Sequence, residues 1–250
     1  LVERMDEQFS NKTYEEWDAV FRSTGDFIYA KVQSIDELED DPQVIANDLE
    51  RSGLFRPIDA RAFIQSNASL RLQPRFGDWR LINAQALVNG SAEIRQDGQV
   101  QIQFHLWDVF AEQQMTGLEL STQPENWRRI AHIVADAIYK RVTGEDGYFN
   151  TRIVYISETG PQNRRVKRLA IMDSDGANHR FITTGRSTAL TPRYSPDYKK
   201  LSYLSYVDGN PRIYVYDIGT GRQTLITQSD NPTFAPRWSP DGNWLLYSMA

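Results

Sequence analysis

The sequence of 250 residues contains no cysteine, which excludes disulfides, thiolate metal sites and cysteine nucleophiles. It has only three histidines, His105, His132 and His179, so a histidine-rich metal centre is nearly excluded. A Ser-His-Asp triad would have to use one of the three. No apolar run approaches the roughly 18 residues of a membrane-spanning helix. The lack of cysteine fits an oxidising compartment.

The sequence also lacks a strong excess of one charge, since 28 basic and 33 acidic residues give a net charge of −5. This balance argues against a sequence-blind nucleic-acid binder, which needs a basic surface to displace counterions. With 40% hydrophobic and 24% charged residues, the composition is that of a soluble protein with a core. The chain starts with Leu and has no apolar signal segment, so we expect a processed product or a region of a longer protein.

The first half mixes helical and strand patterns. Residues 14–21 have the spacing of a short amphipathic helix, and residues 28–32 that of a strand. A further helix is predicted to begin at Asp41-Pro42 and to end before Gly53, because glycine readily takes the left-handed conformation that terminates helices.

Further segments of the first half have the apolar pattern of strands: residues 79–88, 92–96, 99–107 and 113–120. Two dipeptides between or beside them are typical of tight turns, Asn89-Gly90 and Asp97-Gly98. The alternation in the third segment predicts an antiparallel sheet that is covered on one face.

The clearest helical pattern covers residues 127–142, before Gly144. Thr122 and Glu125 have the spacing of a capping box in front of it. His132 is one step from the apolar stripe of this helix and is predicted to be a packing or hydrogen-bonding residue rather than a base. The first half is therefore expected to be an α/β or α+β domain.

The second half contains a repeat with a period of 44 residues. The sequence Arg-Tyr-Ser-Pro-Asp at 193–197 returns as Arg-Trp-Ser-Pro-Asp at 237–241, and residues 169–173 align with 213–217 at the same offset. Short strands with a period of about 40–45 residues are typical of β-propeller blades. Asp173 and Asp217 end equivalent strands and are predicted to cap turns rather than to bind metal.

The repeat predicts an incomplete propeller. Residues 151–183 supply strands two to four of an opening blade, residues 191–227 a whole blade, and residues 235–249 half of the next. Isolated blades expose apolar faces and strand edges, so we expect this sequence to be the front part of a longer protein. A small sandwich is the alternative, but it explains the 44-residue period poorly.

The combination of these domains resembles the TolB family, the periplasmic propeller proteins of the Tol–Pal envelope system. The similarity lies in residues 48–59 (DLERSGLFRPID), in Asp78-Trp79 with residues 84–90, and in residues 129–147. It covers about residues 42–250. The resemblance implies a divergent segment at 1–41, an α/β (or α+β) domain at 42–148 and, at 149–250, the first two and a half blades of an incomplete β-propeller of TolB-type repeats.

The resemblance implies a non-enzymatic periplasmic adaptor without cofactor, metal or catalytic residues. Its family partner is the peptidoglycan-associated lipoprotein Pal, and the family supports outer-membrane integrity and cell division. Family members also contact TolA through an N-terminal arm and are used by bacteriocins for entry. Residues 1–41 do not resemble that arm, so the TolA contact is not transferred to this chain.

In the family, Pal docks on loops that enter the innermost strand of each blade, which here are residues 185–191 and 229–235. Short side chains let a partner approach, and an exposed aromatic side chain can anchor it. The resemblance therefore implies these partner-binding residues: Ser187, Thr188, Ala189, Leu190, Pro232, Thr233, Phe234 and Ala235.

Two other functions are compatible with a propeller. Similar propellers cap the active site of prolyl-oligopeptidase-type hydrolases, but this sequence contains no Gly-x-Ser-x-Gly elbow. The third possibility is a propeller that binds a small ligand in its central channel.

Overall fold

The computed structural model of the chain describes residues 41–65, 74–207, 209–227 and 231–250. The chain divides into two compact units at the Asn150–Thr151 boundary. Among the described helices, none is long and apolar enough to cross a membrane. The helix predicted at 14–21 and the strand predicted at 28–32 lie outside the described residues.

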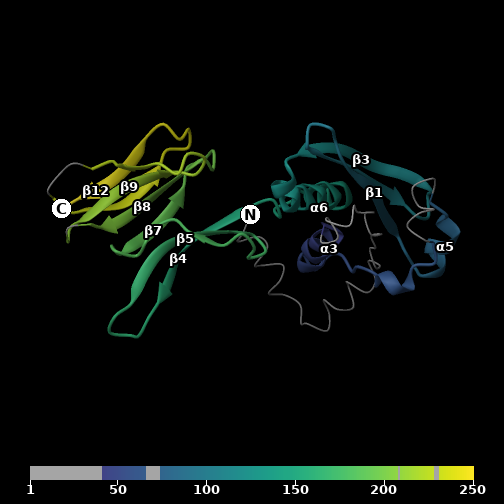
Figure 1. Cartoon of the computed structure of the whole chain (residues 1–250), viewed down its shortest axis with the longest axis horizontal. Helices are drawn as coiled ribbons and strands as arrows, with labels where there is room; N and C mark the ends of the chain where they lie inside the picture. Colours follow the sequence, from purple (N-terminus) through teal and green to yellow (C-terminus); the bar gives the residue numbers. More distant parts are fainter. Residues whose placement is uncertain (1–40, 66–73, 208, 228–230) are drawn as a thin grey trace. The chain divides into compact units, whose positions relative to one another are not determined.

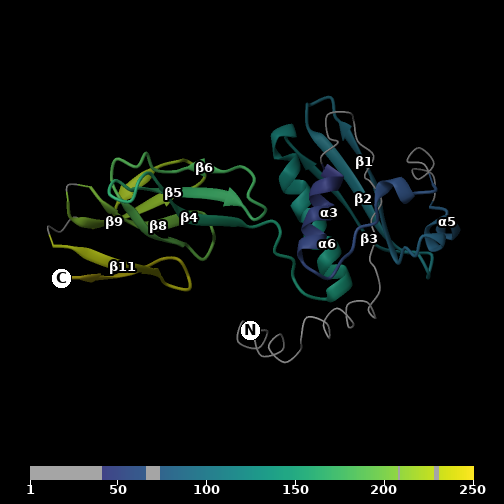
Figure 2. The same cartoon turned by 90° about the horizontal axis from the view of Figure 1, so that it is seen from below.

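The first unit is built on a three-stranded antiparallel sheet in the order β1-β2-β3. Its strands are β1 (Ala86–Ile94), β2 (Val100–Asp108) and β3 (Gln113–Thr122). Two helices, α3 (Asp41–Arg51) and α6 (Trp127–Thr143), lie side by side over one face of this sheet (Figures 1 and 2). The unit is therefore α+β.

Strict alternation in β2 places its apolar side chains on the face beneath the helices. Phe104 and Leu106 are fully buried there, and Val134 and Ile138 of α6 belong to the same core. Adjacent residues such as Gln103 point to the opposite face, as a period of two requires. The prediction of a sheet covered by helices is confirmed.

The prediction of a strand over residues 79–88 is wrong for its first part. Residues Phe76–Leu81 form the short helix α5, and Asn83, at φ 60°, separates this helix from β1. The Trp79 indole is buried, packs edge-on against Phe63 at 5.0 Å, and donates to Gln65 Oε1 at 3.1 Å. These tertiary contacts favour the helix over the local apolar pattern.

The prediction of a turn at Asn89-Gly90 is also wrong, because both residues pair within β1, opposite His105 and Phe104. The Asn89 side chain accepts a hydrogen bond from Trp107 Nε1 at 2.7 Å. A Cβ at residue 90 would clash with the backbone of β2, which explains glycine inside this strand. The turn at Asp97-Gly98 is confirmed, with Gly98 at φ 80°.

The capping box predicted for α6 is absent. Thr122 is the last residue of β3, and a 3-10 turn, η3 (Pro124–Asn126), lies between it and the helix. No side chain caps the first turn of α6 at Asn126. The predicted end is confirmed, since Gly144 takes the left-handed conformation at φ 81°.

The second unit consists of three antiparallel sheets that do not close into a ring. The first blade contains β4 (Arg152–Thr159), β5 (Val166–Asp173) and β6 (Arg180–Phe181). The second contains β7 (Ala189–Tyr194), β8 (Lys200–Tyr206), β9 (Pro211–Asp217) and β10 (Gln223–Leu225). The third contains β11 (Thr233–Trp238) and β12 (Leu245–Met249). This is the incomplete propeller that the repeat predicts.

Equivalent residues of the repeat make equivalent hydrogen bonds. Ser195 Oγ bonds to Asp197 Oδ1 at 2.6 Å and accepts from the Lys200 amide at 2.9 Å. Ser239, 44 residues later, likewise bonds to its Asp241 and accepts from the Trp244 amide at 2.9 Å. The Ser-Pro-Asp sequence therefore fixes the same turn in two successive blades.

Candidate functional site

The residues expected to bind a partner lie at the start of β7 and β11, the innermost strands of the second and third blades. Ser187 and Thr188 precede β7, and Pro232 precedes β11. The other five residues belong to the strands themselves: Ala189 and Leu190 in β7, and Thr233, Phe234 and Ala235 in β11. The loops are therefore shorter than the sequence predicts.

These residues differ in their access to solvent. Ala189 and Thr233, which occupy equivalent repeat positions, are both completely buried. By contrast, the Phe234 side chain is 38% exposed and Ala235 is exposed. Of the candidates in β11, only Phe234 and Ala235 are thus placed to meet a partner.

The buried Thr233 holds the start of β11 in place. Its hydroxyl donates to the Pro211 carbonyl at 3.1 Å and lies 3.2 Å from the hydroxyl of Thr227. Thr227 in turn accepts from the Ile213 amide at 3.2 Å. This chain of bonds ties the innermost strand of one blade to the end of the previous blade, so Thr233 acts as a positioning residue.

A backbone irregularity recurs at the same place in both innermost strands. The pairing register shifts between Leu190 and Arg193 in β7, and between Phe234 and Arg237 in β11. Thr191 and Ala235, which are 44 residues apart, have φ angles of 48° and 52°. Positive φ is uncommon outside glycine and unusual for a β-branched threonine. Both residues are exposed, so each bulge presents a strained backbone segment to solvent.

Thr191 is exposed at the bulge of β7 and is absent from the residues predicted from the sequence. The 44-residue offset pairs it with Ala235, and that offset was already visible in the sequence. The bulge itself has no sequence signal here, because neither position is a glycine.

The histidine of α6 serves to join two helices. His132 is buried, its Nδ1 lies 2.5 Å from Asp48 Oδ2 of α3, and Asp48 Oδ1 accepts from the Arg51 guanidinium at 2.7 Å. The prediction of a hydrogen-bonding residue in the packed helix is confirmed.

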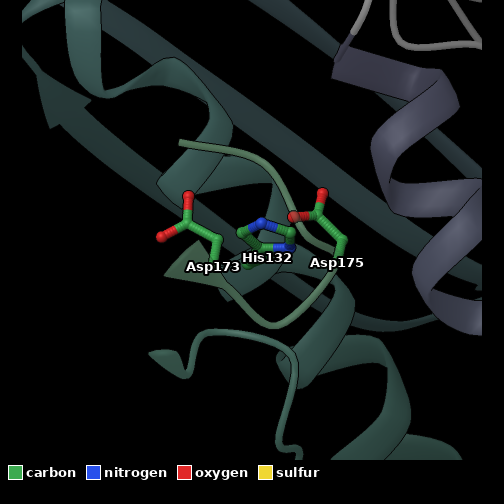
Figure 3. A group of neighbouring side chains, drawn as sticks. All are labelled: His132, Asp173 and Asp175. Atoms are coloured by element: carbon green, nitrogen blue, oxygen red, sulfur yellow. The ribbon is translucent and has the colours of Figure 1, made fainter. Parts of the chain in front are cut away.

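Figure 3 shows His132 on α6 together with Asp173 and Asp175, which come from the end of β5 and the turn after it. His132 belongs to the first unit, and the two aspartates belong to the second. Asp173 Oδ2 accepts from the side-chain amide of Asn178 at 2.5 Å, and Asp175 Oδ1 accepts from the Ala177 amide at 2.9 Å. Both carboxylates therefore stabilise the turn after β5.

Comparison with known families matches both halves of the chain. The TolB amino-terminal domain matches residues 30–115, and the TolB beta propeller domain matches residues 139–250. Neither match favours the hydrolase-cap alternative.

Individual proteins agree with the family matches. The Tol-Pal system protein TolB of Paramagnetospirillum magneticum is 56% identical over 209 residues, which cover 84% of this chain and 47% of that protein. The crystal structure of TolB from Acinetobacter baumannii superposes with a TM-score of 0.75 at 28% identity, covering 90% of this chain and 55% of that one. The chain thus spans about half the length of these relatives. Because of the sequence identity, the share of this chain that the matches cover and the common fold, the chain belongs to the TolB family of the Tol-Pal system.

Proposed function

We propose that this protein is a non-enzymatic periplasmic adaptor of the Tol–Pal system that binds Pal through the exposed bulges of β7 and β11. Membership of the family supports an envelope role, since the relative from Paramagnetospirillum magneticum is a Tol-Pal system protein. In this role the protein contributes to outer-membrane integrity and cell division, and its propeller is a surface that bacteriocins can exploit.

The observation that carries the proposal is the repeated bulge. Two successive blades hold an exposed non-glycine residue at positive φ, Thr191 in one and Ala235 in the other. Such strain persists only where the surrounding structure enforces it, and it is common at binding sites. The bonds of Thr233 supply that enforcement in β11.

Phe234 is the side chain best suited to anchor a partner. It is a large aromatic residue with 38% of its surface exposed. The neighbouring Ala235 is also exposed, and its short side chain leaves the backbone accessible. An aromatic anchor surrounded by small residues allows close approach of a partner loop, which is the usual composition of an interface hot spot.

Titration calorimetry against a purified soluble domain of Pal tests the proposal. The double variant Phe234→Ala, Ala235→Asp should weaken binding at least about tenfold, because it removes the anchor and adds a charge to the bulge. Aspartate tolerates positive φ, so the fold of β11 should persist.

Trp244→Ala is the matched control. Trp244 is also an exposed aromatic residue of the third blade, but it lies in the turn at the opposite end of β11 and β12. It should leave the affinity unchanged. Absence of binding by the folded wild-type protein, or an equal loss in both variants, would contradict the proposal.

A further inference from the structure

The segment that leaves α6, residues 144–150, folds back along this helix. Gly144 ends the helix, and its amide donates to the Lys140 carbonyl at 2.9 Å. A Cβ at Gly147 would lie 2.5 Å from Asp136 Cα, which explains glycine at this close approach to the helix. We call residues 144–150 the anchored segment.

Asp136 of α6 holds the end of the anchored segment. Its Oδ1 accepts from the Phe149 amide at 2.7 Å, and its Oδ2 accepts from the Asn150 amide at 3.2 Å. The Phe149 side chain is completely buried in the core of the first unit, with its ring centroid 5.7 Å from that of Tyr139. Backbone and side-chain contacts therefore fix the chain to α6 as far as Asn150.

The second unit fixes the chain from the next residue onward. The Thr151 carbonyl accepts from the Ser174 amide at 3.0 Å, and Arg152, the first residue of β4, pairs with Asp173 of β5. The Asn150 amide nitrogen is thus held by the first unit and the Thr151 carbonyl by the second. Only the φ and ψ angles of these two residues lie between the two fixed groups.

The composition of the anchored segment is that of a flexible linker, because it contains two glycines and two acidic residues among seven. Such a linker would let all of its residues move. The bonds of Asp136 and the burial of Phe149 remove that freedom, so the segment belongs to the first unit.

We infer that the two units turn relative to each other only through the backbone angles of Asn150 and Thr151, and that Asp136 keeps this hinge short. Hinges are commonly a few residues at the ends of elements, which absorb the change in φ and ψ. Release of the anchored segment from α6 would extend the hinge from two residues to seven, 145–151. The span of a flexible chain would then rise from about 8 Å to about 15 Å.

Distances between two spin labels test the length of the hinge. The sequence has no cysteine, so labels can be attached at Gln96→Cys in the turn between β1 and β2 and at Gln223→Cys in β10, both exposed positions. A six-residue Gly-Ser insertion between Asn150 and Thr151 lengthens the hinge and leaves the bonds of Asp136 in place. We expect it to broaden the distribution of label distances about twofold in pulsed electron paramagnetic resonance.

The matched control carries the same insertion in the hairpin 160–165, between Asn163 and Arg164. This hairpin is exposed, and the pairing of β4 with β5 holds the two sides of the insertion together. The width of the distribution should therefore remain that of the labelled wild type. If the insertion after Asn150 leaves the width unchanged, or if both insertions broaden it equally, the two-residue hinge does not limit the motion and the inference is overturned.

Amide hydrogen exchange measured by NMR tests the role of Asp136. The substitution Asp136→Ala removes both acceptors, so the Phe149 and Asn150 amides should exchange at least about tenfold faster. Asp146→Ala is the matched control, because Asp146 is an exposed carboxylate of the same segment whose bond, at 2.6 Å, is to the Lys140 side chain. It should leave both exchange rates unchanged.

Equal effects of Asp136→Ala and Asp146→Ala on these two amides, or amides that are unprotected in the wild type, would show that Asp136 does not hold the segment. The insertion variants decide the length of the hinge even if Asp136→Ala prevents folding, because they change no residue in the core of the first unit. Neither experiment uses Pal, so failure of this inference leaves the proposed adaptor function standing.

Discussion

The two units of this chain reach stability by different routes. In the first unit, a buried hydrogen bond between Asp48 and His132 joins residues 84 positions apart, and it occurs once. In the second, the bond from Lys200 to Ser195 spans five positions and recurs between Trp244 and Ser239. The bond at the Ser-Pro-Asp turn is local and duplicated, whereas the contact between Asp48 and His132 is long-range and single.

This difference has an energetic consequence. A single long-range pair between buried groups has no substitute when one partner is removed, because the remaining charge stays in a poorly solvated place. A local turn in a repeat depends mainly on its own blade and its nearest neighbours. The first unit should therefore respond to single substitutions more strongly than the second.

The largest effect is expected from His132→Ala in the first unit. The substitution leaves the Asp48 carboxylate buried with only Arg51 of its two described partners, and it should lower the free energy of unfolding by about 3–5 kcal/mol. Hydrogen exchange measured by mass spectrometry would follow α6 and β8 separately. We expect faster exchange in α6 and little change in β8.

His132→Asn provides the control for this prediction. Asparagine can place an amide donor near the position of the imidazole Nδ1, so it should recover part of the lost stability. If alanine and asparagine have the same small effect, the pair does not stabilise the first unit.

The same contrast explains how much of the fold the sequence could predict. The turn at Asp97-Gly98 and the blade turns at Ser195 and Ser239 were predicted because their signals are local. The errors at Asn89-Gly90 and Thr122 arose where a distant group decided the outcome. The Trp107 indole, 18 residues away, bonds to Asn89 and keeps it within a strand.

The candidate residues show the same limit. The repeat predicts that they lie at the entry to the innermost strands, and β7 and β11 begin there, but burial within those strands depends on neighbouring blades. Ala189 and Thr233 were expected at the surface and are buried, and Thr233 bonds to residues of the preceding blade. The positive φ of Thr191 follows from the bulge and has no local sequence signal.

A smaller effect is expected from the two serines of the repeat. Ser195→Ala removes the acceptor of the Lys200 amide in a buried position and should cost about 1–2 kcal/mol. Ser239→Ala removes the equivalent bond in a more exposed turn, where water can replace it, and should cost less than about 1 kcal/mol. Urea unfolding of both variants would measure the two free-energy costs. A larger cost for Ser239→Ala than for Ser195→Ala would contradict this prediction.

The smallest effect concerns pH and has opposite signs for the carboxyls of the blade turns and for Asp136 of the first unit. In the second unit, the bond from Ser195 lowers the pKa of Asp197, and the bond from Ser239 lowers the pKa of Asp241. These carboxyls stabilise the fold above their unfolded pKa of about 3.9 and lose that contribution as the pH falls through the folded value.

In the first unit, burial raises the pKa of Asp136, although its carboxylate accepts from the Phe149 and Asn150 amides. A raised pKa means that the folded state binds the proton more tightly. The contribution of Asp136 is therefore complete below about pH 3.9 and is lost as the pH rises through the folded value. Asp136→Asn should remove this pH dependence from α6 and leave that of β8 unchanged. Hydrogen exchange across about pH 3–6 would measure both. An unchanged pH response of α6 in the Asp136→Asn variant would contradict the role given to this half-buried carboxyl.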